Sequence, residues 1–155
     1  MNEIERKVMD EAELNPQLAY NYLRSFKSNF VSVYSDMVYK SGTPKLNYEF
    51  ARDIKGADVL KHQKRVVESK DPELNYLFAK NISGVSILPH SKVIKESNDL
   101  KYNYLFLRDV MSDLDTPIAL SHIALIKESG EPIYIETLDN LIESRRKIKE
   151  SHISK

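Results

Sequence analysis

The sequence contains no cysteine and no tryptophan, and only four glycines and six prolines among its 155 residues. The absence of cysteine excludes disulfide bonds, thiolate nucleophiles and cysteine-based zinc sites, and it is compatible with a reducing compartment. The sequence also lacks a glycine-rich phosphate loop, a His-Glu-x-x-His pair and a nucleophile elbow. We therefore predict that the protein is not an enzyme and that it uses no metal or other cofactor.

An excess of charge of one sign is also missing. Lys plus Arg number 23 and Asp plus Glu number 23, so no global electrostatic field attracts nucleic acid or an anionic membrane. No apolar run approaches the ~20 residues that span a bilayer. The charged amino-terminal segment, residues 1–14, lacks the apolar centre of a signal peptide. These features predict a folded cytoplasmic protein.

The sequence does contain a repeat with a period of 28 residues. A proline recurs at this interval, and so do a tyrosine and, two positions later, a second aromatic residue. The members of these three columns are Pro16, Pro44 and Pro72; Tyr20, Tyr48, Tyr76 and Tyr104; and Tyr22, Phe50, Phe78 and Phe106. Chance would have to match each column separately, so the period indicates tandem structural repeats.

Each repeat carries start and stop signals for two short helices. Asn15, Thr43 and Asp71 precede the prolines and are predicted N-caps. The apolar residues that follow Pro44 recur with helical spacing. Gly56 and Gly84 stand where a left-handed residue ends the first helix, and Asp58 and Ser86 are predicted to cap the second. We expect a turn of two to four residues between the two helices.

Helices of about 11 residues are marginally stable alone, so one unit cannot bury its own apolar stripe. Stacking of neighbouring units provides a shared core, and we predict an all-α protein, a short α-solenoid in one domain, 1–155. The expected units are 16–43, 44–71, 72–99 and 100–131, with capping helices at 2–13 and 132–150. The fourth unit contains a four-residue insertion within 111–120. The closing helix has a charged side that includes Arg145 and is expected to face solvent, and residues 151–155 are expected to fray.

One segment also resembles a known class of repeat. Glu68–Ile87 contains a Glu-Ser-x-Asp-Pro turn, a Tyr-x-Phe-Ala-Lys helix and a Gly-Val-x-Ile turn. This pattern resembles the short tandem α-helical repeats of bacteriophage and low-G+C bacterial proteins. The resemblance implies an architecture and assigns no catalytic residue.

Two polar columns have the position of packing residues. Asn47, Asn75 and Asn103 fall inside the apolar arc of the first helices, where a buried amide must find hydrogen-bond partners. The favoured interpretation is a ladder of amides that bond backbone groups, and the alternative is a groove that holds an extended peptide. His62, His90 and His122 share a column of the second helices, with Tyr34 in the first unit. Packing is favoured for this column over a pH-sensitive contact. Metal binding is disfavoured because ligands in successive repeats lie too far apart.

A cationic column and two leucines are the candidate binding residues. The cations are Arg24, Arg52, Lys80 and Arg108, on the side of the first helices away from the core. They either bind an acidic partner or form local pairs such as Glu49 with Arg52. Leu77 and Leu105 lie outside the core stripe. They either form an exposed contact patch or are covered by the 111–120 insertion.

These features favour a non-enzymatic scaffold that binds a protein or peptide. A specific form of this hypothesis is an inhibitor of a host protein that is encoded by a phage or mobile element. The first alternative is a nucleic-acid-binding repeat protein, which the interleaved acids Asp53 and Asp109 disfavour. The second is a component that self-associates into a structural assembly. No membrane contact is expected.

Overall fold

The computed structural model describes residues 1–154, and every regular element in that range is a helix. A single helix, α1, begins the chain, and a longer helix, α10, closes it. Four helix pairs lie between them. The bounds are α1 Glu3–Ala12, α2 Pro16–Ser25, α3 Val31–Ser41, α4 Pro44–Asp53, α5 Val59–Glu68, α6 Pro72–Asn81, α7 Leu88–Ser97, α8 Leu100–Asp109, α9 Pro117–Glu128 and α10 Pro132–Ile153.

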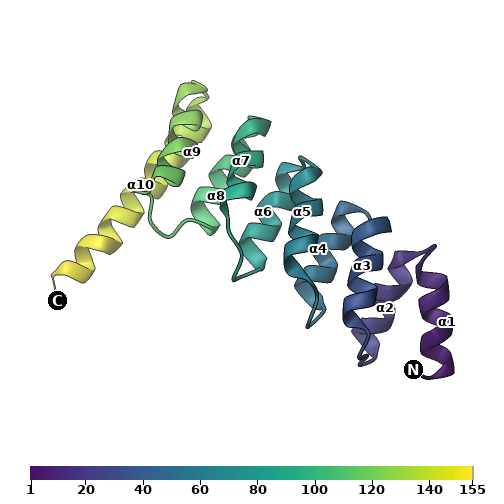
Figure 1. Cartoon of the computed structure of the whole chain (residues 1–155). Coiled ribbons are helices and arrows are strands. Elements are labelled where there is room, and N and C mark those ends of the chain that lie inside the picture. The colour runs from purple at the N-terminus through teal and green to yellow at the C-terminus, as the bar shows by residue number, and fades with distance from the viewer. Residues whose placement is uncertain (155) are drawn as a thin grey trace.

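The helix pairs stack in chain order, and the two chain ends lie at opposite ends of the row (Figure 1). The first helices α2, α4, α6 and α8 contact one another in succession, and so do the second helices α3, α5, α7 and α9. Each unit therefore touches only its neighbours, as in an α-solenoid. The predicted all-α repeat fold is confirmed.

The helix starts follow the cap signals with two exceptions. Thr43 and Asp71 accept hydrogen bonds from the backbone N–H groups of the third helical residues, at 3.1 Å each, and Asp58 caps α5 in the same way. Asn15 occupies the predicted N-cap of α2, but its side chain makes no cap hydrogen bond. The predicted N-cap position was wrong for Ser86, because Ile87 occupies the N-cap of α7.

The turns inside the units are longer than expected. In the first three units they comprise residues 26–30, 54–58 and 82–87. In the second and third units the first helix ends before the isoleucine that continues its apolar stripe. Ile54 and Ile82 adopt extended backbone and are nevertheless buried, at 7% and 8% exposure. Gly56 and Gly84 have the predicted positive φ angles, +89° and +80°, and turn the chain back toward the second helix.

The core consists of three clusters of buried residues, and the second, third and fourth units each contribute one fully buried phenylalanine. Phe50, Phe78 and Phe106 have no exposed surface, and each belongs to a cluster that includes buried residues of the preceding unit. Truncation of such a residue to alanine typically costs about 3–5 kcal/mol. The aromatic column found in the sequence is therefore the interior of the solenoid.

The carboxyl-terminal part departs from the repeat. Within the 111–120 insertion, Met111 and Leu114 are buried in the same cluster as Phe106. Helix α10 continues to Ile153, beyond the predicted end of the closing helix at residue 150, and Lys155 lies outside the described residues. None of the helices formed by residues 1–154 has the length and apolar character needed to cross a bilayer.

Candidate interaction surfaces

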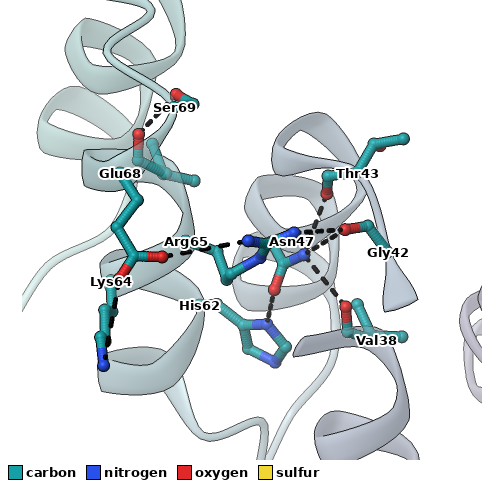
Figure 2. Close-up of polar contacts among 10 residues, drawn as sticks. Val38, Gly42, Thr43, Asn47, His62, Lys64, Arg65, Glu68 and Ser69 are labelled. Carbon is teal, nitrogen blue, oxygen red and sulfur yellow. Dashed lines mark hydrogen bonds and ion pairs between the residues drawn. The ribbon is translucent and has the colours of Figure 1, made fainter. Parts of the chain in front are cut away.

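The asparagine column lies inside the molecule and satisfies the ends of helices. Asn47 has no exposed surface, and its side-chain nitrogen donates to the carbonyls of Val38, Gly42 and Thr43 at 2.9–3.3 Å (Figure 2). Asn75 and Asn103 repeat this pattern one and two units later. These carbonyls belong to the end of one helix pair and the start of the next. The amides therefore fix the junction between units, and the alternative of a peptide-holding groove was wrong.

Each asparagine also binds the histidine of the same unit. The side-chain oxygens of Asn47, Asn75 and Asn103 lie 2.7, 2.8 and 2.6 Å from Nδ1 of His62, His90 and His122. The amide nitrogens already donate to carbonyls, so the amide oxygens must accept and Nδ1 must carry the proton. The imidazole Nε2 then accepts from the preceding unit, namely from Ser35, Gln63 and Ser91 at 2.7–3.0 Å.

The buried imidazoles are neutral and have no free ring nitrogen. Burial lowers the pKa of each of the three histidines to about 4. Their rings lie 4.6–5.0 Å from the phenylalanine rings of the same units. A metal ion could bind only by replacing one of these hydrogen bonds. This geometry favours packing over metal binding as the role of the three histidines.

The surface side of the first helices carries a second repeated contact. The tyrosine hydroxyl of one unit bonds a polar side chain at the end of the next first helix. Tyr20 donates to Asp53 at 2.6 Å, Tyr76 donates to Asp109, and Tyr48 accepts from Asn81 at 2.8 Å. Burial raises the pKa of Tyr20 and Tyr76, with a further contribution from these carboxylates. This contact links successive units at their surface.

The cationic column lies directly beside these tyrosines. Arg24, Arg52, Lys80 and Arg108 each place their charge 5.1–5.9 Å from the ring centre of the tyrosine four residues earlier. The column therefore does form a row on one surface, as expected. Each ring covers one side of its cation, and the other side remains accessible to solvent or to a partner.

Three members of this row are already paired, and Lys80 lies 3.8 Å from the Asp109 carboxylate. Arg52 donates two hydrogen bonds to Asp53, at 2.7 and 2.8 Å, and Arg108 binds Asp109 in the same way. The adjacent guanidinium lowers the pKa of each aspartate to about 2. The expected pairing of Arg52 with Glu49 was wrong, because Asp53 is the partner. The carboxylates neutralise the middle and the far end of the row in part.

The amino-terminal end of the row opens into a basic groove. A concavity of about 540 Å³ lies where the α2–α3 turn meets the end of α4, and its lining includes Arg24, Lys27, Lys55 and Phe26. Asp53 also lines it, with its carboxylate bound by Arg52 and Tyr20. The three cations make no ion pair with any residue in the described range 1–154. Phe26 is 60% exposed and stacks on Tyr22, with ring centres 5.2 Å apart. Exposed aromatic and cationic groups thus meet in one hollow.

The two candidate leucines do not form a fully exposed patch. Leu77 and Leu105 are half-buried and pack against the carboxyl-terminal core cluster. That cluster includes Met111 and Leu114 of the insertion, which favours the interpretation that the insertion covers this region. The area of Leu77 and Leu105 left for a partner is correspondingly small.

One contact was missed by the sequence reasoning. Arg145 was expected on the solvated side of α10, but it is half-buried and donates to the carbonyls of Arg108, Met111 and Ser112 at 2.7–3.0 Å. It thereby satisfies the end of α8 and holds the insertion against the closing helix. No sequence signal distinguishes Arg145 from its charged neighbours, because the fold alone brings these carbonyls within reach.

Comparisons of the chain with protein-family models, with curated proteins and with solved structures find no match.

Proposed function

We propose that the protein is a scaffold that binds an acidic segment of a protein or peptide partner along the exposed edge of its first helices. The observation that carries this proposal is the basic groove at the α2–α3 turn. There the unpaired charges of Arg24, Lys27 and Lys55 line the same hollow as the exposed ring of Phe26. Aromatic and arginine side chains dominate the energetics of protein interfaces, and complementary charge directs association.

The rest of the row extends the surface beyond this groove. Arg52, Lys80 and Arg108 have side chains that are 40–46% exposed, so they can offer polar contacts one unit apart. The paired aspartates reduce their attraction for an anion, and we assign the main contribution to the groove. Leu77 and Leu105, being half-buried, are expected to add a minor apolar contact.

Inhibition of a host protein by a phage- or mobile-element-encoded chain is a specific form of this proposal. The repeat pattern of residues 68–87 supports it by resemblance only.

The test is affinity capture from the native cell, followed by titration of the captured protein after purification. We expect Arg24→Glu combined with Lys55→Glu to weaken binding by about tenfold or more, because two of the three unpaired cations of the groove are reversed. Lys45→Glu is the matched control. It reverses an exposed charge at the opposite end of α4 and should leave affinity unchanged. Retention of full affinity by the double variant would place the binding face elsewhere.

Two further assays on the purified protein distinguish the other candidate functions. Binding of RNA or DNA that falls steeply with salt would favour the nucleic-acid alternative. Concentration-dependent light scattering would favour self-association. The double variant Arg52→Glu with Arg108→Glu measures how much the paired part of the row contributes, and we expect a smaller effect than at the groove.

A further inference from the structure

The second helices of three consecutive units expose one leucine each. Leu60, Leu88 and Leu120 are 68%, 59% and 50% exposed. Each stands two residues before the buried histidine of its unit, and we call them the leucine row. Residues two positions apart on a helix are rotated by about 200° around the helix axis, so their side chains point to nearly opposite sides. The fixed interior position of the histidine therefore holds each leucine on the outer side.

The leucine row is continuous across neighbouring helices. Helix α5 contacts α7, and α7 contacts α9, so the three leucines lie on adjacent ridges of one surface. A single exposed leucine is ordinary in a folded protein. Recurrence on three consecutive packed helices instead places apolar side chains at regular intervals along the solenoid.

A groove and a local excess of positive charge accompany this row. A concavity of about 680 Å³ between α7 and α9 is lined by Leu88, Ile118, Lys92 and Lys95, among other residues. One turn after the leucines, Lys64 and Lys92 are 65% and 73% exposed, and each forms one solvent-exposed pair, with Glu68 at 3.9 Å and with Glu96 at 3.8 Å. Helices α5 and α7 together carry five cationic and two acidic side chains, whereas the whole sequence has balanced charge.

The geometry points to a second docking surface, formed by the leucine row, for an acidic amphipathic helix of a partner protein. Packed helices lie about 8–10 Å apart, so that successive members of the row are separated by about one helix spacing. Residues seven apart on an α-helix are about 10.5 Å apart along its axis. Apolar side chains repeated every seven residues therefore match the row, and flanking acidic side chains face Lys64 and Lys92.

This surface is separate from the basic groove of the proposed function. The groove lies between α2, α3 and α4, and the leucine row lies on α5, α7 and α9. The two surfaces share no helix, so variants of one should leave binding at the other intact.

The experiment uses the full chain and synthetic helical peptides of about three heptads, with leucine on one side and glutamate on its flanks. Fluorescence anisotropy measures binding to the acidic peptide, to a scrambled peptide and to a lysine-flanked version. We expect the acidic peptide to bind and the other two to bind at least about tenfold more weakly. Leu88→Glu and Lys92→Glu should each reduce binding of the acidic peptide, because one removes an apolar contact and the other a complementary charge.

The matched controls are Leu14→Glu and the groove variant Arg24→Glu. Leu14 is 92% exposed outside the row, so both controls should bind the acidic peptide like the original chain. Absence of binding, or equal binding of the lysine-flanked peptide, overturns the proposal. Self-association that Leu88→Glu abolishes also overturns it, since a second copy of the chain would then cover the row.

Discussion

The histidine of each central unit combines three contacts at one ring. His90 donates from Nδ1 to Asn75, accepts at Nε2 from Gln63 of the preceding unit, and stacks on Phe78. Asn75 in turn closes the junction between units through two carbonyls. A buried polar network of this kind stabilises the fold only when every member is satisfied. In the first unit, Ala19 stands in place of the asparagine and Tyr34 in place of the histidine, and both are also fully buried.

Acidification is therefore expected to unfold the protein through these histidines. Unfolded histidine has a pKa near 6.5, whereas burial lowers the pKa of His62, His90 and His122 to about 4. The unfolded chain binds more protons between these values, so the stability present above pH 6.5 is lost as the pH falls toward 4. Three such groups give a slope of up to about 4 kcal/mol per pH unit near pH 5. Urea denaturation across this range measures the slope.

The variant His90→Gln provides the control for this prediction. It removes one of the three titrating groups, so the slope should fall by about one third even if the variant is less stable overall. An unchanged slope would show that the imidazole of His90 is not a source of the pH dependence.

At the scale of single elements, the sequence predicted helix starts better than helix ends. Proline and its preceding cap residue are local signals, and they placed α4 and α6 correctly. The ends of the first helices were placed too late because Ile54 and Ile82 continue the apolar stripe although their backbone is extended. The spacing of apolar residues predicts which side chains are buried, but it does not predict the backbone conformation of those residues.

The candidate site residues could also be predicted from the sequence only in part. The columns of asparagine and histidine could be found by spacing, but their mutual hydrogen bonds depend on two helices packing side by side. The leucine row could also be read as a column, and only the packing of α5, α7 and α9 shows that it faces outward. The contacts of Arg145 depend on the position of α10, which lies outside the repeat.

The capping residues supply a prediction with an internal control. Thr43→Ala and Asp71→Ala each remove an oxygen that accepts from the first turn of a helix, and each should lower the free energy of unfolding by about 1 kcal/mol. Asn15→Ala removes no cap hydrogen bond and should cost less than about 0.5 kcal/mol. Urea denaturation of the three variants tests this. An equal loss for Asn15→Ala would contradict the assignment of the caps.

At the scale of the whole molecule, stability is shared between neighbours. Every pair of helices contacts the pair before it and the pair after it, and the contacts recur at equivalent residues. Ser35 meets His62, Gln63 meets His90, and Ser91 meets His122 across successive junctions. A donor to Nε2 is thus present in every unit that precedes a histidine. Because the junctions are equivalent, the number of units should be adjustable without a new core.

Duplication of residues 72–99 tests this claim most directly. The inserted copy would place Ser91 of the first copy against His90 of the second, and Asp99 would precede proline as Asp71 does. Circular dichroism with thermal and urea unfolding should show a cooperative transition at a higher midpoint, since one more unit and one more interface are added. A duplicated segment 72–95, which breaks the register by four residues, should lower the midpoint. If the in-register duplication loses cooperative unfolding, or unfolds no later than the original chain, the repeating-junction account is contradicted.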